Sequence, residues 1–517
     1  MSVKNLKRVG SRAVMVDLPD LSTVMNYHAA LTTAPLDGQV DAIAAARTVL
    51  VTFDSPRSAA RGAQALETFS PDATEKTTPR EITIDVVYDG EDLEEVAEHL
   101  NMTVDELIEW HTSIEFTGAF GGFAPGFTYC VAADEHNAKD VPRRSSPRTA
   151  VRAGAVGLAG EFSAVYPRTS PGGWQLIGTT ATPMWDAENT PPAAIAPGDI
   201  VRYRQVTEHP PQLPAEKPAP TQEQGAFELT DTGLLTLIED LGRAGNGNLG
   251  VTTSGAADRA AHRAANEAVG NSSKAATLEN IGGLILTART EIAVAVTGAG
   301  EVDVDKRPVT KGHPLVLPVG ATLTIAPGEG LRSYVAVRGG IAAAGELGSR
   351  SADVLSGLGP KPLRPGATLG LADQAKHPGL PVPNPQRDEK VLRCVAGPRD
   401  EWIAGGTDAL TSREWQVSEA SNRVGLRLQA ADGTTLTRAC DGELASEGIV
   451  GGAIQVPTNG EPVVFLRDHA VTGGYPVVAT VVAEDLDIAA QLAPGDTVSF
   501  TIVDPDTLTE TTSPKEH

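Results

Sequence analysis

The sequence predicts a mainly β protein of α+β character that opens with a small α/β domain. The chain has 517 residues, which corresponds to about three or four domains. Its 53 glycines and 37 prolines indicate many turns and short strands rather than a helical bundle. Glycine-rich motifs also recur in the same order in two parts of the chain, which indicates two copies of one β-rich domain.

The composition is that of a globular protein with an acidic surface. Hydrophobic residues make up 41% and aromatic residues only 4%, so the core must consist of Val, Leu, Ile and Ala. The net charge of −24 argues against general binding to nucleic acid or to anionic membranes, although a local pocket can still be positive. No apolar run reaches the roughly 18 residues that span a bilayer.

Cysteine usage indicates a reducing compartment. Cys130, Cys394 and Cys440 are far apart and odd in number, so we expect neither a disulfide framework nor a CxxC zinc site. The first 20 residues lack the apolar core and the cleavage site of a signal peptide. We therefore expect a cytoplasmic protein and predict no metal site within the chain.

The first 80 residues predict the small α/β domain. Residues 13–16 and 48–53 are apolar runs of strand length. Ser55 followed by Pro56 is typical of a helix start, with the serine as N-cap and the proline in the first turn. The alanine-rich segment that follows extends this helix to Phe69.

Two further helices and then short strands are predicted after residue 81. Helical patterns cover residues 92–99 and 104–111. Thr103 and Glu106 have the spacing of a capping box at the start of the second helix.

The internal repeat has three elements. The first copy runs GAVGL from Gly154, GGW from Gly172 and PGDIVRY from Pro197, and the second runs GAIQV from Gly452, GGY from Gly473 and PGDTVSF from Pro494. Paired glycines and PGD are also common hairpin turns, so coincidence is the alternative. Agreement of three elements in order favours duplication.

Two proline-rich segments divide the chain. Residues 208–222 hold five prolines and residues 377–390 hold four, without apolar periodicity. The expected division is an α/β domain at 1–80, a β domain at 81–206, a linker at 207–225, a β domain at 226–376, a proline-rich loop at 377–390, a β domain at 391–505 and a polar tail at 506–517.

Common catalytic signatures are missing from the sequence. The segment Gly245–Gly250 matches the letters of a dinucleotide-binding fingerprint, but residues 251–253 separate it from the helix that such a fingerprint must open. No P-loop, HExxH, GxSxG or SxxK motif is present. Either the chemistry is unusual or another subunit completes the site.

Four blocks of glycine-rich backbone with polar side chains are candidate sites. They are the aromatic segment 122–129, the segment 240–258, the segment 338–353 and the segment 421–476. Glycine lets a backbone approach a ligand, helix starts bind anions, and paired arginines clamp carboxylate or phosphate. The structural alternatives are an aromatic turn on a core, a simple helix cap and loop-bracing ion pairs.

These blocks carry a resemblance to a known enzyme family. Residues 1–206 resemble the B subunit of 5-oxoprolinase, also called the Kip-inhibitor or allophanate-hydrolase-subunit-1 family, through GFAPGF at 122–127, SPR at 146–148 and SPGGW at 170–174. Residues 226–505 resemble the C subunit of the same enzyme, the allophanate-hydrolase-subunit-2 or Kip-antagonist family, through DLGR at 240–243, SGAADR at 254–259, GSRSAD at 348–353, SEGIV at 446–450, GAIQVP at 452–457 and TGGYP at 472–476. The chain thus resembles a natural fusion of the two subunits.

The resemblance implies both fold and reaction. It implies three cyclophilin-like β-barrel domains after the small N-terminal domain. It implies ATP-dependent hydrolysis of 5-oxo-L-proline to L-glutamate together with a separate 5-oxoprolinase A subunit, with ATP and Mg²⁺ as cofactors. The alternatives are a carboxyltransferase module of a biotin-dependent urea or amide carboxylase, and a non-enzymatic regulator of a kinase. Homo-oligomers are compatible with each interpretation.

Roles follow for individual residues on the leading interpretation. The expected catalytic residues are Asp258, Asp468 and Arg350. The expected substrate-binding residues are Phe123, Pro125, Gly126, Phe127, Tyr129, Trp174, Arg243, Ser254, Arg338 and Tyr475. The sequence departs from the family pattern at Phe162, at Thr179 and at His469-Ala470, so no family role is assigned to those positions.

Overall fold

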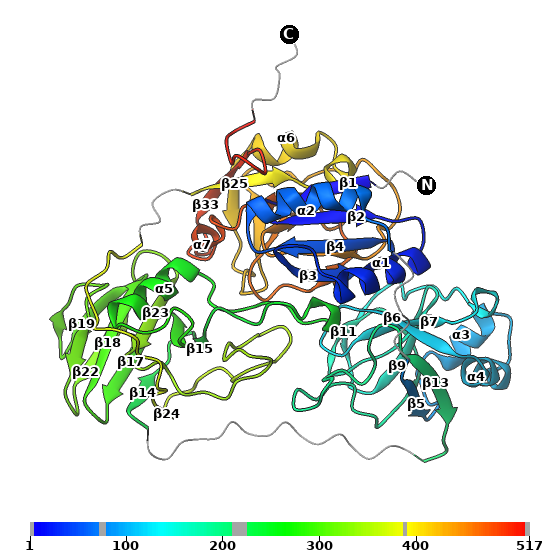
Figure 1. Ribbon diagram of the computed structural model, residues 1–517, viewed down its shortest axis with the longest axis horizontal. Coiled ribbons are helices and arrows are strands. Elements are labelled where there is room, and N and C mark those ends of the chain that lie inside the picture. Colours follow the sequence, from blue (N-terminus) through cyan, green and yellow to red (C-terminus); the bar gives the residue numbers. More distant parts are fainter. Residues whose placement is uncertain (1–4, 72–78, 209–224, 386–389, 512–517) are drawn as a thin grey trace, which may run out of the picture.

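The computed structural model describes residues 5–71, 79–208, 225–385 and 390–511 (Figure 1). Most of the predicted linker therefore lies outside the described residues, as do parts of the proline-rich loop and of the tail. The protein is mainly β, which confirms the predicted class. We name the four described stretches the N-terminal unit, the first β unit, the middle unit and the C-terminal barrel. None of the helices in them has the length and apolarity needed to cross a bilayer.

The N-terminal unit is a four-stranded antiparallel sheet with two helices. Its elements are β1 (Asn5–Val9), β2 (Ala13–Asp17), α1 (Leu21–Thr33), β3 (Gln39–Ala44), β4 (Thr48–Phe53) and α2 (Pro56–Thr68), with strand order β1-β2-β4-β3. The two predicted strands and the predicted helix are confirmed. The Ser55 hydroxyl accepts a hydrogen bond from the Ser58 amide, as expected of an N-cap.

Both faces of this sheet are buried. Val14 and Val16 point to the face that packs on α1 and α2, whereas Met15 lies in a cluster with Val471 of the C-terminal barrel. Successive side chains of a strand point to opposite faces, so burial on both faces requires an unbroken apolar run. This explains why β2 has the sequence Ala-Val-Met-Val rather than an alternation with polar residues.

The first β unit is an open sheet of seven strands with two covering helices. Its elements are β5 (Glu81–Val86), α3 (Leu93–His99), α4 (Val104–Ser113), β6 (Phe116–Gly121), β7 (Thr128–Ala132), η1 (Glu135–Asn137), β8 (Arg148–Val151), β9 (Ala155–Ala159), β10 (Phe162–Val165), β11 (Ser170–Gly172), β12 (Gln175–Thr179) and β13 (Ile200–Gln205). The strand order is β12-β9-β10-β7-β6-β13-β5, and a bridge between Val87 and Thr179 joins the two ends. The capping box of Thr103 and Glu106 is confirmed.

The C-terminal barrel has the same strand plan. Its elements are β25 (Val391–Ala396), η3 (Asp400–Trp402), α6 (Gly406–Thr411), β26 (Trp415–Val417), β27 (Gly425–Ala430), β28 (Glu447–Gly448), β29 (Ala453–Gln455), β30 (Val463–Phe465), β31 (Thr472–Gly473), β32 (Val477–Val481), α7 (Leu486–Ala489) and β33 (Thr497–Ile502). The strands close in the order β25-β32-β29-β30-β27-β26-β33.

The shared plan supports the predicted duplication. Counted from β12, the first sheet has the order β12-β9-β10-β7-β6-β13-β5, and counted from β32, the barrel has the order β32-β29-β30-β27-β26-β33-β25. Strands at the same place in the two orders are equivalent. The last two strands of each order are parallel to each other. The three repeat motifs fall at equivalent places: at β9 and β29, at β11 and β31, and before β13 and β33. The cyclophilin-like character expected of all three β units stays a prediction.

The middle unit consists of two antiparallel sheets and one helix. Its elements are β14 (Phe227–Asp231), β15 (Leu235–Glu239), η2 (Gly247–Leu249), α5 (Arg259–Ala268), β16 (Thr277–Ile281), β17 (Leu284–Ala288), β18 (Ile292–Gly298), β19 (Glu301–Val304), β20 (Arg307–Pro308), β21 (Leu315–Leu317), β22 (Thr322–Ala326), β23 (Arg332–Val337) and β24 (Ala367–Leu369). The sheet orders are β20-β19-β22-β17-β14-β24 and β15-β16-β23-β18-β21, and their facing residues share one core.

Helix α5 has the simple helix cap that the sequence offered as the alternative for the segment 240–258. Its N-cap is Asp258, whose carboxylate accepts from the Ala261 amide, and not Ser254. Ser254 has a left-handed backbone (φ 53°), and its hydroxyl donates to Asp468 at 2.6 Å. An N-cap oxygen must reach the amides of the first turn, which Ser254 precedes by too many residues.

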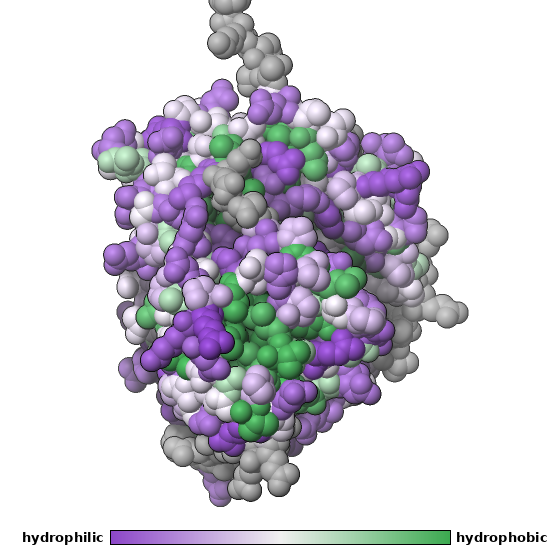
Figure 2. Space-filling model, turned by 90° about the vertical axis from the view of Figure 1, so that its left-hand side faces the viewer, coloured by the Kyte–Doolittle hydropathy of each residue, from purple (hydrophilic) through white to green (hydrophobic). Residues whose placement is uncertain are grey.

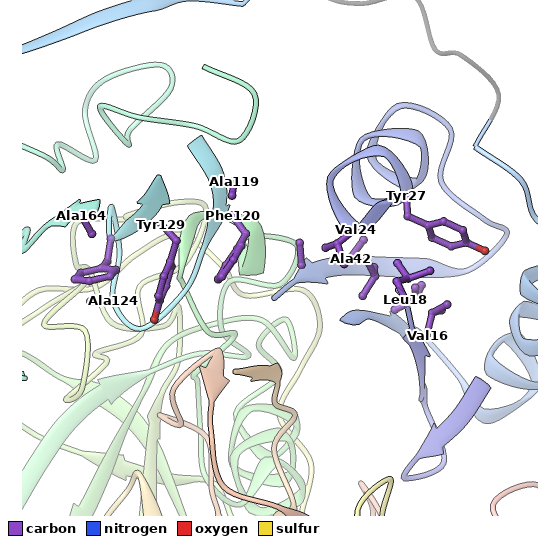
Figure 3. Close-up of a cluster of buried hydrophobic side chains, with 14 of the residues drawn as sticks. Val16, Leu18, Val24, Tyr27, Ala42, Ala119, Phe120, Ala124, Tyr129 and Ala164 are labelled. Atoms are coloured by element: carbon purple, nitrogen blue, oxygen red, sulfur yellow. The ribbon is translucent and has the colours of Figure 1, made fainter. Parts of the chain in front are cut away.

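One apolar cluster runs from the N-terminal unit into the first β unit (Figure 3). Val24 of α1 and Ala42 of β3 belong to it, and so do Phe120 of β6 and Tyr129 of β7. Phe120 and Tyr129 stack with ring centroids 4.4 Å apart. The cluster holds the loop between β6 and β7, the GFAPGF segment, against the N-terminal unit.

Glycines let the first β unit and the middle unit touch backbone to backbone. The Gly126 amide donates to the Leu249 carbonyl at 3.2 Å. Gly250 has φ 74°, and a Cβ there would overlap the carbonyl oxygen of Ala124 and lie 2.6 Å from that of Gly122. The glycines of the fingerprint-like segment therefore serve a contact between two units.

The middle unit presents apolar side chains to solvent. Figure 2 shows green side chains gathered in the lower half of the face seen from the left of Figure 1. The exposed large hydrophobic residues of this unit include Val316 and Val319, which are 65% and 69% exposed. The expectation of a homo-oligomer stays a prediction.

Gly250→Ala is expected to weaken the docking of the two halves. Gly433→Ala is the control, because Gly433 has a similar backbone (φ 72°) but a Cβ there would have no heavy atom within 4 Å. Its cost is therefore the strain of a left-handed alanine alone, about 1 kcal/mol. We expect Gly250→Ala to cost at least about 1 kcal/mol more, because its methyl group overlaps two carbonyl oxygens. Equal shifts in the urea midpoint of the two variants would contradict this.

Candidate functional site

Two adjoining cavities lie where the units meet. The first, the lip pocket, has a volume of about 230 Å³ and is lined by three units. Its wall residues are Phe123, Ala124, Pro125, Arg168, Thr169, Ser170, Pro171, Gly250, Thr252, Asp353, Leu355, Ser356, His469, Ala470 and Val471. Motifs from both halves of the chain thus meet around one space.

The second cavity, the junction pocket, has a volume of about 350 Å³. The N-terminal unit, the segment 244–254, the start of α5 and the C-terminal barrel line it. It shares Thr252, His469 and Val471 with the lip pocket, so a common wall separates the two cavities.

The GFAPGF loop forms one lip of the first cavity. Phe123 has φ 44°, and its amide donates to the Thr472 hydroxyl at 3.2 Å. This left-handed backbone is costly for a phenylalanine and indicates a site that the surroundings fix firmly. Pro125 also lines the cavity, whereas Gly126 serves the turn with φ 76°.

The three other predicted substrate-wall residues lie beneath the lip. Phe127, Tyr129 and Trp174 are 1%, 6% and 5% exposed and meet edge to face. Phe162, one of the departures from the family pattern, packs edge to face on Tyr129. These aromatic rings support the loop from inside, and none of them lines the lip pocket.

Asp353 supplies a carboxyl group to the wall of the lip pocket. Its Oδ1 accepts from the amides of Leu355 and Ser356, both at 2.9 Å. Its Oδ2 is buried without a hydrogen-bond partner in the part of the chain that the structure describes. Burial, and then the negative charge of Asp468, raises the pKa of Asp353. A carboxyl group tuned in this way is suited to proton transfer.

His469 is a neutral hydrogen-bonding residue in the common wall. Its Nδ1 lies 2.8 Å from the Ala470 carbonyl, which can only accept, so Nδ1 carries the proton. Its Nε2 lies 3.2 Å from the Thr252 hydroxyl and accepts from it. Burial lowers the pKa of His469, which favours this neutral form.

A buried ion network lies next to these cavities. Arg423 is 2% exposed and pairs with Asp468 at 2.9 Å and with Glu279. Glu239 lies 3.4 Å from the same guanidinium, and Arg332 lies 3.3 Å from Glu279. The network joins β15, β16 and β23 of the middle unit to the C-terminal barrel.

The charges in this network do not cancel unless one acid is protonated. Three carboxyl groups face two guanidinium groups, and the carboxyl oxygens of Glu239 have no hydrogen-bond partner among the described residues. Burial, together with the charges of Glu279 and Asp468, raises the pKa of Glu239 well above its ordinary value. Arg423 and Arg332 instead lower the pKa of Glu279. We therefore assign the neutral form to Glu239.

The predicted acids Asp468 and Asp258 line neither cavity. Asp468 is fully buried and accepts from Arg423, from the Ser254 hydroxyl and from the Val354 amide at 3.1 Å. It thereby holds the residue that follows Asp353. Asp258 caps α5 and accepts from Gln491 at 3.0 Å.

The predicted anion-binding arginines are not brought to one cavity. The Arg243 guanidinium is buried and donates to the carbonyls of Glu346 and Ser351. Arg350 donates to the Ala343 carbonyl at 3.1 Å, and Arg338 donates to the Val269 carbonyl at 2.7 Å, at the end of α5. None of these arginines lines the lip pocket or the junction pocket. Tyr475 is 45% exposed and lines neither cavity.

Sequence reasoning missed the arginines that line these two cavities. Arg12, Arg259 and Arg467 line the junction pocket, and Arg168 lines the lip pocket. Arg259 and Arg467 are the sequence neighbours of the predicted residues Asp258 and Asp468, so the motif SGAADR and the segment 421–476 held the signal. The described residues contain no group of three His, Cys, Asp or Glu side chains placed to hold a metal ion.

Comparisons with known proteins match the two halves separately. The family profile described as "Carboxyltransferase domain, subdomain C and D" matches residues 4–195, and the profile "Carboxyltransferase domain, subdomain A and B" matches residues 249–502. The chain is 36% identical over 292 residues to the C subunit of 5-oxoprolinase from Escherichia coli K12, covering 53% of this chain and 90% of that one. It is 35% identical over 210 residues to the B subunit of 5-oxoprolinase from Escherichia coli O157:H7, covering 38% and 93%.

One further similarity covers nearly the whole chain, and another is to part of a larger enzyme. The crystal structure of TTHA0988 superimposes with a TM-score of 0.82 at 32% identity, covering 95% of this chain and 99% of that one. Urea amidolyase of Lachancea kluyveri is 31% identical over 307 residues, which cover 53% of this chain and only 17% of that enzyme.

Arg423→Met is expected to destabilise the protein by about 3–5 kcal/mol. Removing one partner of a buried ion network leaves carboxylates without compensation. Arg427 lies in the same strand region with an exposed side chain, so Arg427→Met is a matched control with an expected effect within about 0.5 kcal/mol. Urea denaturation measures both, and similar small effects would show that the network adds no stability.

Proposed function

Because the chain belongs to the carboxyltransferase-domain family that includes 5-oxoprolinase subunits B and C, we propose that it is a natural fusion of these two subunits. With a separate A subunit it forms an ATP-dependent hydrolase that converts 5-oxo-L-proline to L-glutamate. The observation that carries the proposal is that one chain covers nine-tenths of a B subunit and nine-tenths of a C subunit in tandem. The free cysteines Cys130, Cys394 and Cys440 fit a cytoplasmic location.

The lip pocket is the proposed reaction site. A lactam carbonyl is a poor electrophile, and ATP supplies a phosphoryl group that turns its oxygen into a leaving group. We propose that Mg²⁺ enters with the phosphates of ATP, as is usual for this ion. The chain's own residues bind and orient the ring: Phe123 and Pro125 offer apolar walls, and the Arg168 guanidinium beside Gly357 offers a charge for the substrate carboxylate.

Asp353 is the proposed proton-transfer group in this pocket. Its raised pKa brings the carboxyl group closer to neutral pH, where it can both take and return a proton. Asp468 acts as a positioning residue because it holds the Val354 amide, and His469 forms part of the pocket wall.

Carboxyl transfer to urea or a related amide is the second candidate. The description of the matching family and the similarity to urea amidolyase favour it. It needs a biotin-bearing partner, whereas lactam opening needs an A subunit and ATP.

Reconstitution separates the two candidates. The fusion, a 5-oxoprolinase A subunit, ATP and Mg²⁺ are expected to release glutamate from 5-oxoproline, and omission of any component is expected to stop the release. Biotin-dependent incorporation of bicarbonate without glutamate release would favour the second candidate instead.

Asp353→Asn is expected to lower kcat at least about 100-fold, because proton transfer by a positioned side chain typically contributes 10²–10⁴-fold. Asp373 is exposed in the same unit, so Asp373→Asn is a control for loss of one negative charge. In the unchanged enzyme, kcat should fall as the pH is lowered, with an apparent pKa above the ordinary range of an aspartate. Asp353→Asn should remove this acid limb of the pH profile. A variant that retains both kcat and the limb would exclude Asp353 from proton transfer.

A further inference from the structure

The junction pocket collects one arginine from each of three units. Arg12 lies in the turn between β1 and β2, Arg259 opens α5, and Arg467 follows β30. These positions are more than 200 residues apart in sequence, and only the docking of the units brings them together.

The three guanidinium groups differ in how far they are neutralised. Arg12 pairs with Glu484 at 2.7 Å, and Arg467 pairs with Asp487 at 3.3 Å. Among the described residues, the Arg259 guanidinium instead donates to the carbonyls of Leu241 and Ser254, both at 3.2 Å. Among the hydrogen bonds of the described residues, none uses Nη1 of Arg259 or of Arg467.

Nearby acids are already engaged. Asp487 accepts from the backbone amides of Arg259 and Ala260 as well as from Arg467. Asp41 accepts from the amides of Gly247 and Ala42, and burial raises the pKa of Asp41 to about 6. The carboxylate of Asp487 thus accepts from the amides at the start of α5. The hydrogen bonds of the Arg259 guanidinium among the described residues go to carbonyl oxygens instead.

Arg467 places a second positive charge beside Arg259. The neighbouring Arg467 and burial lower the pKa of Arg259 to about 9, because the charged form is penalised there. Two buried hydroxyl groups in the wall, Ser11 and Thr480, also lack hydrogen-bond partners among the described residues.

We propose that the junction pocket binds a phosphoryl group through Arg259 and Arg467, with Arg12 closing the site from the N-terminal unit. Two guanidinium groups with free N–H donors match the several oxygens and the double charge of a phosphate, whereas a carboxylate is satisfied by one. If the proposed function holds, this group belongs to the nucleotide or to the phosphorylated substrate, since the pocket shares a wall with the lip pocket.

Inorganic phosphate is the probe, and the full chain is used without an A subunit or 5-oxoproline. Isothermal titration and thermal melting at constant ionic strength are expected to show saturable phosphate binding and a rise in Tm. Arg259→Gln is expected to weaken the binding at least tenfold. Arg263 lies on the same helix with an exposed side chain, so Arg263→Gln is the matched control and should bind phosphate as the unchanged protein does.

Arg12→Gln provides a second variant should Arg259→Gln fail to fold, because the Arg12 side chain is 42% exposed. ATP and 5-oxoproline, titrated in parallel, distinguish a nucleotide phosphate and a substrate carboxylate as the source. Absence of saturable phosphate binding would overturn the proposal. So would a loss of phosphate affinity in Arg263→Gln that equals the loss in Arg259→Gln. Either result leaves glutamate release by the reconstituted enzyme untouched, so the two proposals fail separately.

Discussion

The buried guanidinium of Arg423 is the constraint on which the arrangement of the candidate site depends. It lies between the middle unit and the C-terminal barrel and is surrounded by Glu239, Glu279 and Asp468. Charges removed from water are tolerated only when they are paired and hydrogen-bonded, so the two units can dock in only the register that completes this network. Through Asp468 the network also fixes the Val354 amide and hence the adjoining Asp353.

Close backbone contact adds a second constraint on the same region. Gly122 lies against Thr472 of the C-terminal barrel, and Gly250 lies against the GFAPGF loop. The sheet of the N-terminal unit then closes the arrangement, since one of its faces packs on Val471. Ion pairs across this contact, such as Arg399 with Asp17 at 2.6 Å, set its register. The two cavities are therefore products of docking, and no single unit contains either of them.

Much of the fold was predictable because its signals are local. The strands at 13–16 and 48–53, the cap at Ser55 and the capping box at Thr103 each follow from neighbouring residues. The duplication was visible because turn motifs are kept where the strand plan is kept.

The site was predicted less well. Short motifs identified the right segments, including the lip, but not which side chain of a motif faces the cavity. The arginines show the physical reason: an arginine in a glycine-rich turn can bind a ligand or can donate to nearby carbonyls, and the sequence does not distinguish these two uses. Arg338 and Arg350 donate to carbonyls, whereas the Arg259 guanidinium keeps Nη1 without a hydrogen bond among the described residues and lies beside Arg467.

Fusion of the two halves in one chain favours the assembly of cavities whose walls come from both halves. In Escherichia coli the relatives of the two halves are named as separate subunits. Joining them makes docking intramolecular, and a linker of moderate length gives an effective concentration in the millimolar range. The interface then needs less affinity of its own to stay assembled. The interface between the halves, built on close glycine contacts and on ion pairs such as Arg399 with Asp17, can therefore enclose the Asp353 carboxyl group in one cavity and the Arg259 guanidinium in the next, on either side of the wall formed by Thr252 and His469.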